Sequence, residues 1–244
     1  MNILTVVKNI LFPPGCVLCD FTMEPNTVSN ICGRCAEHMQ FCSDGLCCER
    51  CGKPVIGFGE KQLCYFCVNN KSKYFDRIVS VFEYEGLIRE SNLRYKSRGI
   101  QKYAEVYANV MSARFYEEYG DTDIDFICAA PSHKSKIQSN GFDHVEEICR
   151  YFSKITHIKH RQGLLFKTRR TAKQSSLNYE MRVKNLVDSM NVRDGAYVKE
   201  KNVLLLDDVC TTRSTIMECA RALKKNGAKN VYALTLATAV KSEE

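Results

Sequence analysis

The sequence lacks a long apolar run. Its longest uninterrupted apolar stretches cover only a few residues, whereas a helix that spans a bilayer needs about 20. We therefore expect no transmembrane segment. The first 12 residues also lack the continuous apolar core and the small-residue cleavage site of a secretory signal, and we interpret them as a short amphipathic helix that ends at Pro13 and Pro14. These absences predict a cytoplasmic protein, with a peripheral position at the inner face of the membrane as the alternative.

The amino-acid composition is ordinary except for its cysteine content. Hydrophobic residues make up 45% and charged residues 26% of the 244 positions, which excludes disordered, collagen-like and low-complexity proteins. The length suits one or two domains. Cysteine is the exception, because ten of the 14 cysteines fall in the first 67 residues. Thiols stay reduced in the cytosol, so this clustering indicates metal or redox chemistry rather than disulfides.

Eight of these cysteines form four C-x-x-C pairs, namely Cys16 with Cys19, Cys32 with Cys35, Cys48 with Cys51, and Cys64 with Cys67. One pair aims two thiolates at one ion, and two pairs complete a tetrahedral Cys₄ zinc site. Twelve residues separate the first two pairs and twelve separate the last two, which favours two successive zinc ribbons. Crossed pairing, with the first and third pairs sharing an ion, is the alternative. A thioredoxin-like redox motif would need only one pair. We interpret Cys42 and Cys47 as spectators.

The positive charge is concentrated in a central segment. Residues 1–70 hold five Lys/Arg and six Asp/Glu (net −1), whereas residues 131–193 hold thirteen against five (net +8), in a chain of net charge +7. Such an excess suits an anionic partner, and a solvated basic face is the alternative. Aromatic residues lie among these cations, as in grooves that bind single-stranded nucleic acid: Tyr151, Phe152, Phe166 and Tyr179. The periodicity places Phe152 on a core face, which weakens the argument for base stacking.

From about residue 71 the pattern changes, which divides the chain into a double zinc ribbon over 1–70 and a second domain over 71–244. Apolar periodicity predicts the following order: strand 75–84, helix 86–96, a longer helix ending at Gly120, strand 126–130, a helix through 145–155, strand 164–166, strand 203–206, helix 215–226 and strand 231–237. This alternation of strands and helices predicts an α/β fold with a parallel sheet and helices on both faces.

Chemistry-bearing residues follow the strand at 203–206. In parallel sheets, ligands bind outside the carboxyl ends of the strands. Asp207 and Asp208 stand there, and a hydroxyl-rich turn then opens a helix whose amides and positive dipole end suit a phosphate: Thr211, Thr212, Ser214 and Thr215. Carboxylates beside a phosphate cradle indicate a site for a phosphorylated sugar. The alternatives are a plain strand end with an N-cap, or direct binding of Mg²⁺ by the two acids.

Residues 203–215 contain four apolar residues, two acids, a variable pair and a Thr-Thr-x-Ser-Thr turn, in that order. This pattern resembles the PRPP loop of type I phosphoribosyltransferases. The resemblance extends to the ComF family, in which a zinc ribbon precedes a phosphoribosyltransferase domain. Further matching segments are Tyr84-Glu-Gly, Arg94-Tyr-Lys96, Ala130-Pro131-Ser132-His133 with Gly141-Phe142, and Arg170-Thr-Ala-Lys-Gln174 with Leu177, Arg182 and Asn185. The resemblance implies a type I phosphoribosyltransferase-like parallel sheet flanked by helices, with a small N-terminal zinc-ribbon domain.

The resemblance also implies roles for individual residues. Asp207 and Asp208 would meet the ribose hydroxyls, and the turn containing Thr211, Thr212, Arg213, Ser214 and Thr215 would bind the 5-phosphate. The pyrophosphate would face Lys96 and the turn at Ser132 and His133. Residues 170–182 resemble the mobile hood that covers the pocket. In a working transferase, Mg²⁺ would bridge ribose and pyrophosphate oxygens and basic groups would neutralise the charge that develops.

The chain departs from the family pattern at three places. Arg213 replaces the usual Gly, Asn140-Gly-Phe-Asp-His144 replaces Arg-Gly-Phe-Asn-Gln, and Ala130 replaces Pro. A guanidinium at 213 would either pair with the 5-phosphate or, held by Asp207, fill the space of the ligand. We expect it to point outward and the turn to remain competent.

Three functions compete. The favoured one is a ComF-like cytoplasmic protein that assists uptake or handling of single-stranded DNA in natural competence and has a PRPP-binding-type pocket. Its partners would be PRPP or a related sugar phosphate, single-stranded DNA and a protein of the competence machinery, and its cofactors two structural Zn²⁺ ions and Mg²⁺ with PRPP. The alternative is a phosphoribosyltransferase enzyme with an unknown acceptor. A third possibility is a docking module built on the zinc ribbons, with a degenerate transferase domain as sensor.

Overall fold

The computed structural model describes residues 15–24, 30–39, 41–42, 47–53, 55, 63–69, 74–132, 141–169 and 186–239. The expected N-terminal helix over 1–12, the hood over 170–182 and His133 lie outside these residues. Among the described helices, none combines the length and the apolar character needed to cross a membrane.

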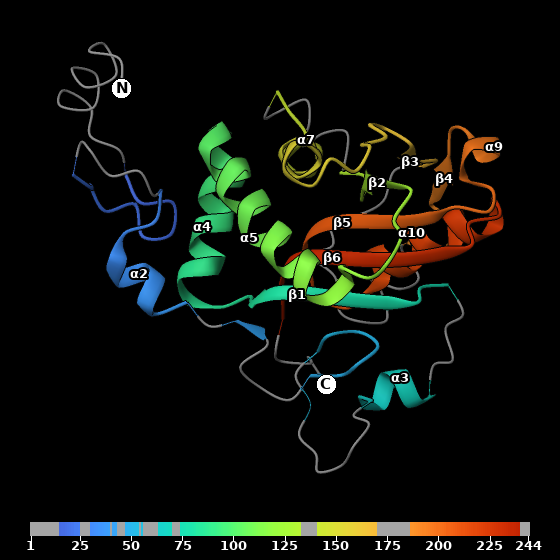
Figure 1. The fold of residues 1–244 in the computed structure, drawn as a ribbon, viewed down its shortest axis with the longest axis horizontal. Coiled ribbons are helices and arrows are strands. Elements are labelled where there is room, and N and C mark those ends of the chain that lie inside the picture. The colour runs from blue at the N-terminus through green and yellow to red at the C-terminus, as the bar shows by residue number, and fades with distance from the viewer. Residues whose placement is uncertain are drawn as a thin grey trace.

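A four-stranded sheet forms the centre of the molecule (Figure 1). Its strands are β1 (Arg77–Glu83), β6 (Asn230–Thr238), β5 (Asn202–Cys210) and β2 (Phe126–Ala129), in that order, and all neighbours pair in parallel. Buried, largely apolar runs such as residues 203–206 and 233–237 are typical of strands covered on both faces. The predicted parallel α/β fold is therefore confirmed.

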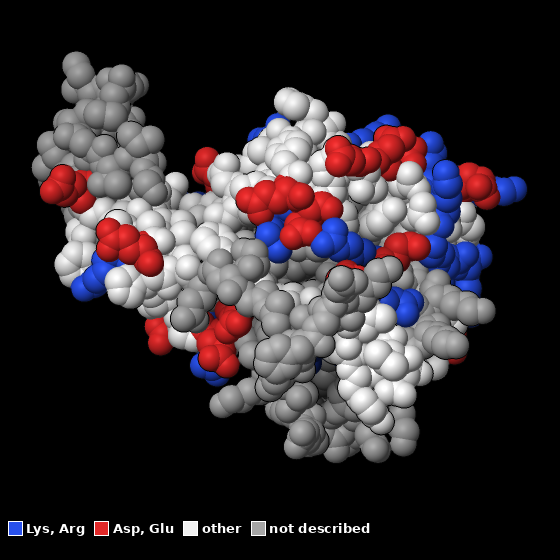
Figure 2. Space-filling view, turned by 60° about the horizontal axis from the view of Figure 1, so that its bottom comes forward, with Lys and Arg blue, Asp and Glu red and all other residues white. Residues whose placement is uncertain are grey.

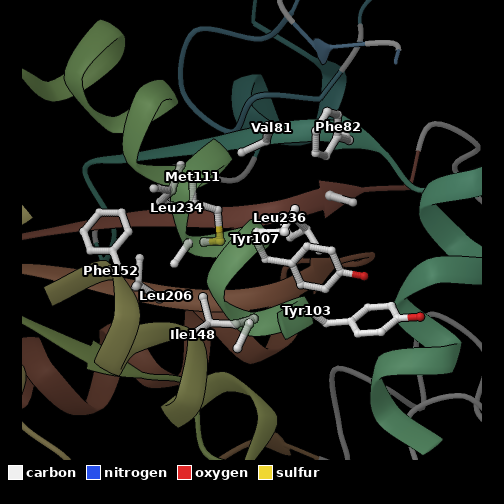
Figure 3. Packing of buried hydrophobic residues seen from close by; sticks show 14 of the residues in the cluster. Val81, Phe82, Tyr103, Tyr107, Met111, Ile148, Phe152, Leu206, Leu234 and Leu236 are labelled. Atoms are coloured by element: carbon white, nitrogen blue, oxygen red, sulfur yellow. The ribbon is translucent and has the colours of Figure 1, made fainter. Parts of the chain in front are cut away.

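Helices cover both faces of the sheet. α5 (Gln101–Tyr119) and α7 (His144–Thr156) pack on one face, together with α4 (Gly86–Arg98), and α10 (Ser214–Lys225) packs on the other. Figure 3 shows the first core, where Met111 and Phe152 from the helices meet Leu206 and Leu234 from the strands. Phe152 is fully buried there, so its ring is not available for a nucleic-acid base.

Local sequence explains where α4 and α7 begin and end. The Asp143 carboxylate accepts hydrogen bonds from the amides of Val145 and Glu146, which fixes the start of α7. α4 ends at Gly99, whose φ of +65° favours glycine. A Cβ at Gly99 would lie 2.6 Å from the Phe142 ring, so this position also allows the segment before α7 to approach α4.

A second, two-stranded sheet lies beside the main one. β3 (Leu165–Lys167) pairs antiparallel with β4 (Met190–Val192), and the short helix α9 (Gly195–Val198) leads into β5. The apolar run at 164–166 predicts β3 correctly. β4 and α9 are missed, because β4 has a polar, exposed Asn191 between its two apolar residues and α9 is barely one helical turn long.

The cysteine-rich segments contact both faces of the sheet region. Near α2 (Gly33–Glu37), the Ser91 hydroxyl of α4 donates to the Val17 carbonyl at 2.7 Å. In the second segment, which includes α3 (Tyr65–Asn69), the Arg50 carbonyl accepts from the Ile78 amide at 2.9 Å and so covers part of the outer edge of β1. Figure 1 shows α2 next to α4 and α3 on the other side of β1. The boundary at residue 70 stays a prediction.

Candidate functional site

Two groups of four cysteines come together. The first contains Cys16, Cys19, Cys32 and Cys35, and the second contains Cys48, Cys51, Cys64 and Cys67; within each group all sulfurs lie within 4.8 Å of one another. The Sγ atoms of Cys19 and Cys32 are 3.8 Å apart, and those of Cys51 and Cys64 are 3.6 Å apart. Zn–S bonds of about 2.3 Å in a tetrahedron place sulfurs about 3.8 Å apart. The clusters therefore fit zinc, and sequential pairing is confirmed.

The surroundings of Cys16 in the first cluster favour a thiolate. Burial raises the pKa of Cys16, but hydrogen bonds from backbone amides of Cys32 and Cys19 lower it to about 7. The Cys32 amide donates to the Cys16 sulfur at 3.3 Å. Cys47 belongs to neither cluster, since its thiol donates to the Cys42 carbonyl at 2.8 Å.

Two buried carboxylates stand toward the carboxyl end of β5. Asp207 pairs in register with Thr235 of β6, and the Ala130 amide after β2 donates to the Leu206 carbonyl at 2.9 Å. Both aspartates are at least nine-tenths buried. The sheet thus brings Asp207 and Asp208 next to the turn at 130–132, as ligand sites of open parallel sheets require.

Asp208 is surrounded by polar groups from two helices. Its Oδ2 forms an ion pair with Lys96 of α4 and lies 3.3 Å from Nε2 of His144 and 3.4 Å from Nδ2 of Asn92. Burial raises the pKa of this carboxyl, but Lys96 and His144 outweigh it, so the pKa lies well below its usual range. Asp208 is therefore held as a carboxylate.

Asp207 has the opposite environment. Its Oδ1 accepts a hydrogen bond from the Asp208 amide at 2.8 Å. Burial and the neighbouring Asp208 charge raise its pKa well above the usual range. Two adjacent acids with opposite pKa shifts in one buried position are a pattern found at functional sites.

The turn after β5 leads directly into α10. The hydroxyls of Thr212 and Ser214 lie 2.8 Å apart, and Ser214 is the first residue of the helix. Thr211 and Thr215 are partly exposed on either side of them. Hydroxyls and helix amides thus gather at this N-terminus, together with the positive end of the helix dipole.

Arg213 in this turn does not point outward. It is only 5% exposed, and its Nη2 lies 3.9 Å from the Sγ of Cys64 in the second cysteine cluster. The expectation of an outward side chain is wrong, because no local pattern in the sequence indicates that the second ribbon docks beside this turn. The φ of Arg213, +64°, is uncommon for a residue with a side chain.

The turn after β2 contributes Ser132. Its hydroxyl donates to Oδ1 of Asp143 at 2.9 Å, the same oxygen that caps α7. Ser132 is thereby tied to the start of the helix that carries His144. His133, the other predicted residue of this turn, lies outside the described residues.

Two residues around Asp208 were missed from the sequence. Asn92 lies one helical turn before Lys96 in α4, so helix spacing from Lys96 could have identified it. His144 belongs to the segment that departs from the family pattern, and that departure was the signal. The Tyr95 hydroxyl donates to the His144 carbonyl at 2.8 Å, which ties the two helices together below Asp208.

A basic surface lies at the other end of the strands. Lys201 and Lys229 directly precede β5 and β6, and Lys159 and Arg161 flank the bridge between His160 and Ile127 at the start of β2. Together with Arg193 we call these residues the amino-end surface. Figure 2 shows Lys and Arg side chains, with acidic ones among them, gathered at the end that carries α9 and β4 in Figure 1.

Aromatic rings on this side already carry cations. The Arg161 guanidinium lies 3.3 Å from the centroid of the Tyr197 ring, and the Arg193 guanidinium lies 4.9 Å from that of Phe166. Arg150 of α7 lies 4.4 Å from the Tyr151 ring in the same way. Contacts with phosphates suit such a surface better than stacking of bases on bare rings.

Comparison with known proteins adds further observations. Residues 7–68 match the family model described as "Double zinc ribbon domain". The chain is 25% identical to the DNA utilization protein YhgH of Escherichia coli O6:H1 over 228 residues, which cover 91% of this chain and 96% of that protein. It is 22% identical to the competence protein ComFC of Bacillus subtilis over 245 residues, covering 91% and 93%.

Solved structures are also similar. A hypoxanthine phosphoribosyltransferase from Trypanosoma cruzi aligns with a TM-score of 0.36 and 10% identity, over 57% of this chain and 65% of that one. A phosphoribosylpyrophosphate synthetase from Mycobacterium smegmatis aligns with a TM-score of 0.34 and 19% identity, over 56% and 34%.

Proposed function

Since this chain is a member of the ComF family, we propose that it handles single-stranded DNA in natural competence and carries a PRPP-binding-type pocket at the carboxyl end of its sheet. The names of its relatives, a DNA utilization protein and a competence protein, support the DNA-related role. We place the protein in the cytoplasm and expect a protein of the competence machinery as a further partner.

One observation carries the pocket: a buried acid pair and a hydroxyl-rich helix start meet at one strand end. Asp207 and Asp208 would accept hydrogen bonds from ribose hydroxyls. The 5-phosphate would bind at Thr211, Thr212, Ser214 and Thr215. Lys96, already paired with Asp208, would turn toward the pyrophosphate, and Ser132 would line the same side. Carboxylate oxygens also suit Mg²⁺, which would neutralise phosphate charge when bound.

The amino-end surface is our candidate for DNA. Of the 13 cations in residues 131–193, six fall outside the described residues, and Lys159, Arg161 and Arg193 lie on this surface. Phosphate contacts need only positive charge within reach, so binding should be tolerant of sequence. The pocket and this surface lie at opposite ends of the parallel strands, so the geometry favours simultaneous rather than exclusive binding.

The DNA role is tested by the salt dependence of binding. We expect Arg161→Ala with Arg193→Ala to weaken binding of labelled single-stranded oligonucleotides of any sequence. Two lost phosphate contacts should reduce the slope of log K against log salt by about 1.4, at about 0.7 per contact on single strands. Fluorescence anisotropy at several salt concentrations measures both effects.

Arg34→Ala is the matched control, since it removes an exposed cation of the first ribbon. The control should leave affinity and slope unchanged. If it has the larger effect, the zinc ribbon binds the DNA and the amino-end surface does not. Release of pyrophosphate from PRPP in the presence of candidate acceptors would instead favour the transferase alternative.

A further inference from the structure

The second cysteine cluster and the turn between β5 and α10 are in direct contact through Arg213. Its guanidinium donates to the Cys64 sulfur over 3.9 Å, and 149 positions separate the two residues in the chain. The first cluster has no such contact with the turn among the described residues. A partly buried cation near the first cluster is Lys102 of α5, which donates to the Gly15 carbonyl.

Electrostatics explain why a cation is held there. An ion with two positive charges and four thiolates leaves the occupied cluster with a net negative charge. A buried charge is tolerated only next to opposite charge. Arg213 and Lys53 are both buried beside the second cluster, at 5% and 9% exposed, so together they can balance it. Outer-shell partners of this kind commonly change metal affinity by about 10- to 100-fold.

The backbone of Arg213 adds a second observation. A left-handed φ of +64° is strained at a residue with a Cβ, and such strain persists where surrounding contacts compensate for it. Here the compensating contact is that of the guanidinium with the cluster. The flanking hydroxyls of Thr212 and Ser214 are placed by the same turn.

We propose that zinc in the second cluster holds the turn 211–215 in its ligand-binding shape, with Arg213 as the positioning residue that connects the two. The inference rests on the sugar-phosphate pocket of the proposed function. Since coupling between two sites is reciprocal, a sugar phosphate in the turn also strengthens binding of the second ion. The turn is then competent only in the metal-loaded protein.

Zinc release from the full-length protein to a zinc-selective chromogenic chelator tests the link. Arg213→Gly should release the second ion about 10- to 100-fold faster than the wild type, and Arg213→Lys, which retains a cation, should fall between them. Lys102→Met is the matched control, because it removes a partly buried cation near the first cluster and should change only release of the first ion. An unchanged release of the second ion from Arg213→Gly overturns the proposal.

The coupling itself is read from the same experiment with saturating ribose 5-phosphate or PRPP with Mg²⁺. These ligands should slow release of the second ion from the wild type several-fold and leave Arg213→Gly unaffected. A wild type that binds either ligand without any change in zinc release overturns the link but leaves the pocket standing.

If the wild type binds neither ligand, the proposed pocket is wrong. Amide hydrogen exchange then still tests whether zinc in the second cluster holds the turn 211–215 in shape. Removal of the second ion should then speed exchange of the amides at 211–215. Unchanged exchange overturns the proposal, and thermal unfolding of each variant confirms that the fold is retained.

Discussion

At the scale of single residues, the two adjacent aspartates of β5 are the most informative feature. Asp208 faces Lys96 and His144, whereas Asp207 faces its own neighbour's amide and charge. Burial raises the pKa of both carboxyls, so their different partners decide the opposite directions of the net shifts. The charged form of Asp207 therefore lowers the stability of the fold. Residues that bind ligands commonly lower stability in this way.

Replacing each aspartate by asparagine should have opposite effects on stability. Asp208→Asn leaves Lys96 without its buried charged partner and should destabilise the protein by about 3 kcal/mol. Asp207→Asn retains an acceptor for the Asp208 amide and removes an acid that the fold disfavours in its charged form. It should therefore melt above the wild type at pH 7.

The pH dependence supplies the control for this prediction. A carboxyl whose pKa is raised by folding loses stability as pH rises from its unfolded value of about 3.9 toward the folded value. The advantage of Asp207→Asn should accordingly grow from pH 5 to pH 8. Circular dichroism measures the melting temperatures, since the chain has no tryptophan. An advantage that shrinks with pH would contradict the assigned shift, and both variants should bind PRPP with Mg²⁺ more weakly.

At the scale of elements, the second ribbon is held against the sheet by its backbone. Gly52 has a φ of +64°, and a Cβ there would lie 2.9 Å from the Ile78 carbonyl oxygen of β1. We expect Gly52→Ala to lower the free energy of unfolding by about 1 to 3 kcal/mol, through strain and loss of the ribbon's contact with the edge strand. Denaturant unfolding in the presence of zinc measures the effect.

Gly33→Ala is the matched control in the first ribbon. A Cβ at Gly33 meets nothing within 4 Å, and the residue lies in α2. Alanine there should be neutral or slightly stabilising. Equal losses in both variants would show that the contact between Gly52 and β1 does not hold the second ribbon.

Local sequence patterns predict the elements of the fold better than the contacts between them. Spacing within C-x-x-C pairs and buried apolar runs are local patterns, and they predict the two clusters and the parallel sheet. The residues after β5 follow from the rule for strand ends. The contacts of Arg213 with Cys64 and of His144 with Asp208 join distant segments. Only the packing of ribbon, helix and sheet sets them, and no local pattern encodes that packing.

At the scale of the whole molecule, the sheet separates the two cysteine clusters. The first cluster packs with the core under α5 and α7, and the second with the core under α10. The acid pair lies toward the carboxyl ends of the strands and the amino-end surface at their starts. Loss of either metal should therefore disturb a core that supports part of the acid-pair site, because α4 and α7 belong to one core and α10 to the other.

The most direct test of this account is a titration of single-stranded DNA in the presence of PRPP and Mg²⁺. We predict that DNA affinity measured by anisotropy stays within about twofold of its value without PRPP, and that calorimetry detects PRPP binding to the DNA-saturated protein, because the two ligands occupy opposite ends of the sheet. Mutually exclusive binding, or no binding of PRPP and DNA by the zinc-loaded wild type, would contradict it.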